Sequence, residues 1–271
     1  MALEKLSELK KICLKEKETD LYTIFIIRHI SIRITRLLLP TGISANQVTL
    51  IFLITGVVGS ILLGIGDPSY SIFGILLLQL SYIFDCVDGE IARYRKQSSV
   101  NGVFIDSIGH EILTPAIFLA MTFFVFNNTH QIFMLVLGTI ATWASQRPMV
   151  TAKEHILLTF LVSRHLPYYD FSKLNKSEST FDLTEGSESL FSKFIIAFLY
   201  YPGAMNVFSV LAVFYIFYPV ISNYAIGAYF LLQIFVQIAL PIRWLKNDSI
   251  EKDFLRLREN VVKNLKDQSS L

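Results

Sequence analysis

Long apolar segments separated by short polar connections dominate the sequence from residue 46 to residue 245. A helix needs about 20 mostly apolar residues to cross a bilayer. Six segments are about this long: 46–66, 69–92, 103–126, 129–147, 203–222 and 224–245. The pattern therefore predicts an all-α integral membrane protein with six transmembrane helices.

The segment before the first predicted span has a different pattern. Residues 21–39 are apolar but contain three arginines, Arg28, Arg33 and Arg36, and this combination favours an amphipathic helix in the membrane interface. Pro40 and Gly42 end that helix, and Ser44 with Asn46 supplies capping groups for the first span. The arginines either anchor the helix to an anionic leaflet or bind a phosphate group.

Composition and charge agree with a membrane protein, since 53% of the residues are hydrophobic and 17% are charged. All 24 Lys and Arg residues fall in four stretches: 1–45, 93–96, 147–193 and 243–266. The connections on the other side contain none, so the positive-inside rule predicts a multi-pass cell-membrane protein with both termini in the cytoplasm.

Three regions follow from this pattern. We expect cytosolic and interfacial helices in residues 1–45, a six-helix catalytic domain in residues 46–246, and a cytosolic tail in residues 247–271. The catalytic domain would include a long polar cytoplasmic connection at residues 148–193. The first twenty residues alternate Lys and Glu with Leu, which is not the pattern of a cleavable signal peptide, and no nucleic acid partner is expected.

Charged residues interrupt the apolar pattern near the second and third predicted spans. Five are carboxylates and one is an arginine: Asp85, Asp88, Glu90, Asp106, Glu111 and Arg93. A charged side chain at membrane depth costs roughly 2.5–3.5 kcal/mol on insertion scales. Such a group of acids therefore needs a metal ion, a cationic ligand or water, and we expect it to form the functional site at the cytoplasmic boundary.

Helical spacing brings several of these groups together. Asp85 and Asp88 are three residues apart and share one helix face, and Asp106 and His110 share a face of the next helix. Two helices joined by a short turn run antiparallel, so these faces can meet. Several carboxylates suit Mg²⁺ or Mn²⁺, and two ions that share carboxylates are typical of phosphoryl chemistry. The spacing thus predicts a pyrophosphate site.

Small residues and one cation accompany the acids. Gly89, Ala92 and Gly102 would let a phosphorylated group approach the backbone, and Arg93 would neutralise phosphate oxygens. A structural alternative exists for each alone, because small residues permit close helix packing and an arginine at a helix end can be an interfacial anchor.

Together these residues resemble a known family signature. The run Asp85-Cys-Val-Asp88-Gly89-Glu-Ile-Ala92-Arg93, followed by Gly102 and Asp106 at the expected intervals, resembles the pattern D-x-x-D-G-x-x-A-R-x(8)-G-x(3)-D-x(3)-D of the CDP-alcohol phosphotransferase (CDP-alcohol phosphatidyltransferase) family. Seven fixed positions agree. The last aspartate of the pattern falls on His110.

The resemblance implies an activity. An acceptor hydroxyl would attack the β-phosphorus of a CDP-alcohol and release CMP. Asp85, Asp88 and Asp106 would hold two divalent ions. The residues lining the site for the CDP moiety would be Gly89, Ala92, Arg93 and Gly102. The stretch Ser44–Thr49 resembles the family's Pro-Asn-x-Val-Thr segment, which makes Asn46 a candidate polar group near the site. The family is also commonly homodimeric.

His110 leaves three possibilities open. In the family the corresponding aspartate is the proposed general base and helps to hold the second ion, and a neutral imidazole can do either. Alternatively the chain is a degenerate protein that binds a CDP-alcohol without catalysis.

A cation transporter would also keep acids in the membrane, and metal-dependent CMP formation would separate it from a transferase.

The sequence leaves the substrates open as well. The donor is either CDP-diacylglycerol, with a polar acceptor such as a polyol phosphate, or a small soluble CDP-alcohol with a lipid or polyol acceptor. In the first case Arg28, Arg33 and Arg36 would be placed to bind the phosphate of the acceptor.

Overall fold

The computed structural model describes residues 5–14, 22–97, 100–148, 151–153, 155–158, 198–256 and 258–259. All regular structure in these residues is helical. Its elements are α1 (Leu6–Cys13), the π-helical η1 (Thr23–Ile27), α2 (Arg28–Leu38), the 3₁₀ turn η2 (Leu39–Thr41), α3 (Ala45–Gly64), α4 (Pro68–Tyr94), α5 (Val100–Thr129), α6 (Ile132–Ser145), α9 (Gly203–Tyr215) and α10 (Pro219–Lys246). Most of the predicted connection at residues 148–193 lies outside the described residues.

Four of these helices are long and apolar enough to cross a membrane. They are α3, α4, nearly all of α5, and α10. Two further apolar helices, α6 and α9, have 14 and 13 residues. This agrees with an all-helical membrane protein.

The boundary between the last two predicted spans differs from the prediction. The expected span 203–222 ends as a helix at Tyr215, and α10 begins at Pro219. Residues 219–222, predicted to end the fifth span, instead form the first turn of α10. Proline is favoured at the first helical position because the N–H that it lacks would have no partner there.

The chain divides into two compact units. The first comprises residues 1–146 and 195–231, and the second comprises residues 147–194 and 232–271. Within the second unit, the ammonium of Lys153 lies 2.6 Å from Asp253 Oδ2 and 4.8 Å from the ring centre of Trp244. The domain boundaries expected from the sequence stay predictions.

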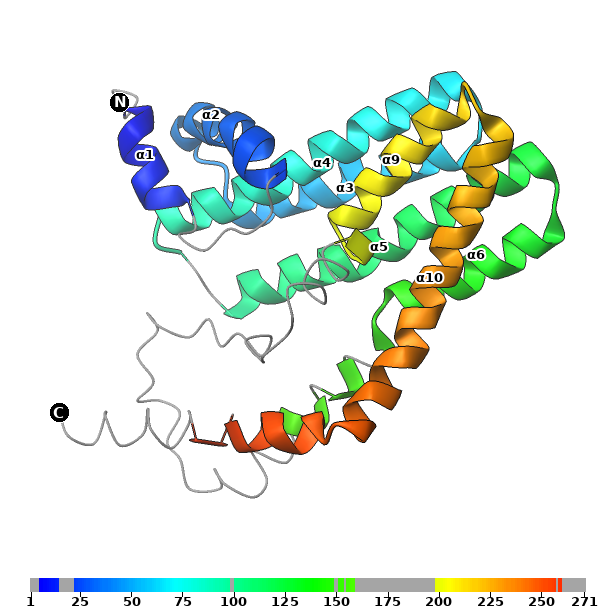
Figure 1. Ribbon diagram of the computed structural model, residues 1–271. Helices are drawn as coiled ribbons and strands as arrows, with labels where there is room; N and C mark the ends of the chain where they lie inside the picture. The colour runs from blue at the N-terminus through cyan, green and yellow to red at the C-terminus, as the bar shows by residue number, and fades with distance from the viewer. Residues whose placement is uncertain are drawn as a thin grey trace. The chain divides into compact units, whose positions relative to one another are not determined.

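In the first unit, α3 and α4 run side by side (Figure 1). Their backbones approach each other closely at small residues. A Cβ built on Gly74 would lie 2.6 Å from the backbone N of Leu63 and 2.7 Å from the carbonyl O of Gly59. Helices in membranes commonly associate through such small residues, since these permit close van der Waals contact. This packing fixes α4, which carries Asp85 and Asp88, against α3.

The N-terminal helices pack near the C-terminal end of α4. Leu9 and Cys13 of α1 form a buried cluster with Ile32 of α2, and Tyr94 of α4 packs against this cluster. Figure 1 shows α1 and α2 beside this end of α4. The interfacial position of the N-terminal helix in a membrane remains a prediction.

A turn and a helix cap connect α2 to α3. Gly42 has φ +76°, a conformation that suits glycine. Ser44 caps α3: its hydroxyl accepts a hydrogen bond from the backbone N–H of Gln47, and the Gln47 side chain accepts one from the backbone N–H of Ser44. The predicted cap at Ser44 is confirmed, and its partner is Gln47 and not Asn46 because the capping box uses the third helical residue.

Candidate functional site

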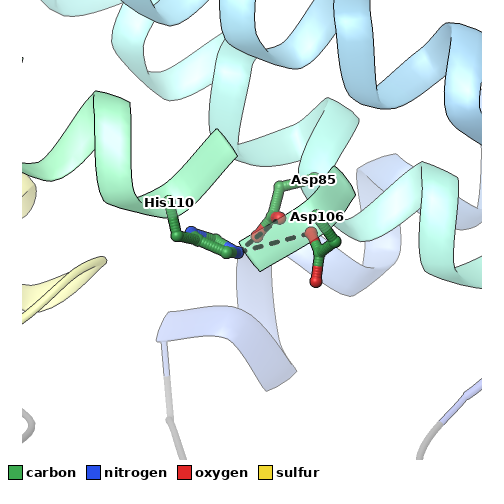
Figure 2. Close-up of side chains that lie close together, drawn as sticks. All are labelled: Asp85, Asp106 and His110. Atoms are coloured by element: carbon green, nitrogen blue, oxygen red, sulfur yellow. Dashed lines mark ion pairs between the residues drawn. The ribbon is translucent and has the colours of Figure 1, made fainter. Parts of the chain in front are cut away.

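Two acids and a histidine converge between α4 and α5. Nε2 of His110 lies 3.2 Å from Oδ1 of Asp85 and 3.5 Å from Oδ1 of Asp106. Figure 2 shows the imidazole directed at both carboxylates, one on each helix. One ligand atom from each residue lies within 4.8 Å of the other two. The predicted meeting of the α4 and α5 faces is thus present for these three residues.

Aromatic rings hold the imidazole in place. The ring centre of His110 lies 5.4 Å from that of Phe52 and 5.1 Å from that of Tyr201. Phe52 is fully buried and occupies the space beside Gly109, where a Cβ would lie 2.8 Å from Phe52 Cε1. Gly109 therefore lets the Phe52 ring pack next to His110.

Asp88 is the most buried acid of the site. Only 6% of its surface is exposed to solvent, and its Oδ2 accepts a 2.7 Å hydrogen bond from the Thr49 hydroxyl. Thr49 lies on α3, one turn after the Ser44 cap, so the start of α3 positions this carboxylate. A hydrogen-bonded partner of this kind orients a carboxylate that binds a metal.

These side chains line a cavity of about 300 Å³. Its lining residues are Thr23, Arg28, Tyr82, Asp85, Cys86, Asp88, Gly89, Arg93, Asp106, His110, Tyr201 and Pro202. The lining therefore combines three carboxylates with two arginines. Such a set can bind an anionic ligand together with a divalent cation.

Arg93 lies along its own helix. Its Nε donates a hydrogen bond to the carbonyl of Cys13 at the end of α1. A Cβ on Gly89 would lie 3.1 Å from Nη1 of Arg93. Gly89 thus leaves room for the guanidinium on the cavity side of α4.

Arg28 and Glu90 form a buried pair. Nη1 of Arg28 lies 3.1 Å from Oε1 of Glu90, and Ser31 and Thr35 each donate a 2.6 Å hydrogen bond to the same carboxylate. Glu90 is fully buried. Arg28, Ser31 and Thr35 of α2 thus all bind the Glu90 carboxylate of α4. A buried charge needs partners of this kind.

The hydroxyl of Tyr201 is buried and makes no hydrogen bond within the described part of the chain. Its burial, together with the charge of Asp85, raises the pKa of the phenol well above its usual value. The phenol therefore stays protonated, and Tyr201 lines the cavity with a hydroxyl that has no acceptor in the described part of the chain. This is the behaviour expected of a group that contacts a ligand.

The structure gathers some of the predicted site residues and separates others. Asp85, Asp88, Gly89, Arg93, Asp106 and His110 line the cavity, whereas Asn46, Ala92 and Gly102 do not. Asn46 is exposed, and the polar residue of its segment that reaches the site is Thr49. The roles predicted for all nine residues stay predictions.

Two members of the predicted acidic group lie elsewhere. Glu90 binds α2, and Glu111 is exposed and does not line the cavity. Helical spacing explains the difference, since neither residue is three or four positions from the acid on its own helix that lines the site. Sequence reasoning also missed Thr49, Phe52 and Tyr201, which lie outside the motif, and Gly109, which precedes His110 on α5.

Two of the three separations among the converging ligand atoms fit a shared divalent ion, and the third, between the two carboxylates, is within 4.8 Å. Atoms that share one ion at about 2.0–2.2 Å lie about 3.0–3.5 Å from each other. The separations of 3.2 Å and 3.5 Å from His110 Nε2 to the two carboxylates fall in this range. Asp88 lines the same cavity but lies outside this group of three ligand residues.

Comparison with known proteins identifies the family. The family model of CDP-alcohol phosphatidyltransferase matches residues 42–181, which is just over half of the 271 residues. The chain belongs to this family, as the sequence motif predicts.

One curated relative shares part of the sequence. The chain is 28% identical over 121 residues to the "Bifunctional IPC transferase and DIPP synthase" of Thermococcus kodakarensis. The match covers 44% of this chain and 27% of the relative. The similarity thus spans little more than a quarter of that protein.

Proposed function

We propose that this chain transfers a phospho-alcohol or phosphatidyl group from a CDP-alcohol to an acceptor hydroxyl and releases CMP. The observation that carries the proposal is the cavity in which Asp85, Asp88, Asp106 and His110 meet Arg28 and Arg93. It joins the family's acidic motif to cationic groups that can bind phosphate. The transferase named in the relative supports the same type of reaction.

The acidic residues would hold one or two divalent ions, Mg²⁺ or Mn²⁺. Asp85, Asp106 and His110 would bind one of them, and Asp88 would add a ligand. A bound ion neutralises the pyrophosphate and the charge that develops on the departing CMP. Thr49 orients Asp88, and Arg93, held over Gly89, would contact phosphate oxygens of the CDP moiety.

The acceptor hydroxyl must lose a proton as it attacks phosphorus. His110 is the predicted general base, and its Nε2 faces the cavity acids. The lone pair of this nitrogen either accepts a proton or binds an ion, since it cannot do both at once. The donor hydroxyl of Tyr201 would bind a phosphate or acceptor oxygen.

Two donor classes fit the family. One is CDP-diacylglycerol with a polyol phosphate acceptor, and the other is a soluble CDP-alcohol with a lipid or polyol acceptor. Arg28 is buried in the pair with Glu90 and reaches the cavity, whereas Arg33 is exposed. Of the α2 arginines, Arg28 is therefore the one placed to contact a substrate phosphate.

The proposal places the site on the cytoplasmic side of a multi-pass membrane protein with six spans, in which α6 and α9 are the two shorter ones. The Lys and Arg distribution supports it. Labelling intact cells with a membrane-impermeant maleimide tests it: Asn128→Cys should react and Lys96→Cys should not. The opposite pattern would reverse the orientation.

A homodimer is a further proposal, carried by the family resemblance alone. Light scattering on the detergent-solubilised protein would measure the mass of the complex. A mass of one chain after subtraction of detergent would contradict it.

The test of the activity is CMP release from a panel of CDP-alcohols and acceptors with Mg²⁺ or Mn²⁺. Release should require the ion and should disappear in Asp88→Asn. Binding of a CDP-alcohol without release of CMP would favour the alternative that the chain has lost catalysis because His110 replaces the aspartate. Ion uptake into proteoliposomes without CMP formation would favour a transporter.

A further inference from the structure

The residue at position 110 changes the donor atoms of the ion site. Where the family pattern has an aspartate, this chain offers the nitrogen Nε2 of His110. This nitrogen is the atom that approaches both Asp85 and Asp106 (Figure 2). The cavity thus offers one nitrogen and several oxygens at ligand distance from each other.

The ring is fixed in this orientation by its surroundings. Phe52 and Tyr201 pack on it at ring-centre distances of 5.4 Å and 5.1 Å, and Gly109 makes room for Phe52. A ligand whose ring is already oriented loses little freedom when an ion binds. The buried, unpartnered hydroxyl of Tyr201 in the same cavity is a second sign that a ligand occupies this space.

The change of donor alters which ion the site prefers. Mg²⁺ takes oxygen ligands, whereas imidazole is a ligand for transition ions. Replacing a carboxylate by a neutral imidazole also removes one negative charge. The loss of charge weakens binding of every divalent cation, and a transition ion regains part of that loss through its bond to nitrogen.

We propose that His110 Nε2 is a direct ligand and that it makes this site prefer divalent transition ions over Mg²⁺, with Mn²⁺ as the probe ion of that class. The proposal rests on the proposed function only for the presence of an ion site. In this arrangement His110 does not act as the base, since its lone pair is in the bond to the ion. The proton of the acceptor then passes to a carboxylate oxygen.

Binding of Mn²⁺ to the purified full-length protein tests the proposal directly. Mn²⁺ is detected by electron paramagnetic resonance, and pulsed measurements resolve coupling to a ¹⁴N nucleus that is bonded to the ion. We expect this coupling in the wild type and its loss in His110→Asp, with Mn²⁺ still bound. Mn²⁺ bound through Asp85 without ¹⁴N coupling, or no Mn²⁺ binding at all, would overturn the proposal.

Competition by Mg²⁺ measures the selectivity. The Mg²⁺ concentration that displaces half of the bound Mn²⁺ should be clearly higher for the wild type than for His110→Asp. His130→Asp is the matched control, because His130 is an exposed histidine in the turn between α5 and α6. It should behave like the wild type. Equal competition in all three proteins would also overturn the proposal.

CMP release separates this inference from the function it builds on. CMP release with equal use of Mg²⁺ and Mn²⁺ and no ¹⁴N coupling would leave the transferase intact and reject the ligand role of His110. Coupling to ¹⁴N that is lost in His110→Asp, without CMP release from any donor, would establish the ion site and reject the transferase.

Discussion

The Thr49 hydroxyl donates a 2.7 Å hydrogen bond to Oδ2 of Asp88 across the α3–α4 interface. The same hydroxyl lies 3.1 Å from the carbonyl oxygen of Ala45 in its own helix, and its single hydrogen is directed to the nearer Asp88 oxygen. The bond to Asp88 links the start of α3 to the motif on α4 and holds one acid of the site in a buried position. Thr49 is therefore a positioning residue.

Removing this hydroxyl should impair the reaction. We expect Thr49→Val to lower CMP release by about 10–100-fold, since partners that orient metal ligands have effects of this size. Thr49→Ser should keep most of the activity because it keeps the donor. Thr142→Val removes a buried hydroxyl that bonds only to a backbone carbonyl of α6, and equal losses in Thr142→Val and Thr49→Val would contradict a role through Asp88.

The buried pair of Arg28 and Glu90 should contribute to stability. Glu90→Gln leaves the Arg28 charge without its partner carboxylate, and breaking a buried pair in this way costs about 3–5 kcal/mol of folding free energy. A clear drop in melting temperature in detergent is expected. Glu111→Gln changes an exposed glutamate and should melt like the wild type. An unchanged melting temperature for Glu90→Gln would show that the pair does not hold α2 on α4.

Gly89 should affect binding of the CDP-alcohol through its contact with Arg93. The Cβ of Gly89→Ala would lie 3.1 Å from Nη1 of Arg93 and would shift the guanidinium by a few tenths of an ångström from its place beside the cavity. We expect a higher KM for the CDP-alcohol, with Mn²⁺ binding unchanged. In Gly227→Ala the new Cβ would lie at the same 3.1 Å from a flexible side chain, Met134, outside the site. A normal KM in Gly89→Ala would rule out Arg93 as a donor contact.

Replacing Tyr201 should lower activity without lowering stability. Tyr201→Phe removes a buried hydroxyl that has no hydrogen-bond partner among the described residues, so the protein without substrate should be as stable as the wild type or more stable. CMP release should fall, because the lost donor would contact substrate. Tyr229→Phe instead removes a donor to the Phe198 carbonyl and should lower the melting temperature while leaving CMP release intact. Full activity in Tyr201→Phe would contradict a substrate contact.

Much of the site motif could be predicted from spacing along the helices. Asp85 and Asp88 lie on one face of α4, and Asp106 and His110 are four residues apart on α5, so the sequence alone brings them to one boundary. The same spacing puts Glu90 on another face of α4, since it is five and two positions from Asp85 and Asp88, but it does not say which neighbouring helix that face meets. Only the placement of Ser31 and Thr35 on α2 decides its role.

The residues that support the site could not be predicted in the same way. Phe52 and Thr49 come from α3, and Tyr201 precedes α9, about 90 residues after His110. Their contacts depend on how the helices pack, which the hydrophobic pattern does not specify. The hydrophobic pattern also did not predict the end of α9 at Tyr215. The residues between α9 and α10 are as apolar as the helices, so hydrophobicity does not change there.

The most direct test of the central claim is CMP release by three proteins under one set of conditions, with the active donor and increasing Mn²⁺: wild type, Asp106→Asn and Glu111→Gln. Asp106 and Glu111 both lie on α5, but only Asp106 lines the cavity. We predict ion-dependent release by the wild type and Glu111→Gln and none by Asp106→Asn. Release that needs no ion, or that is equal in all three proteins, would contradict a metal-dependent transferase site at Asp85, Asp106 and His110.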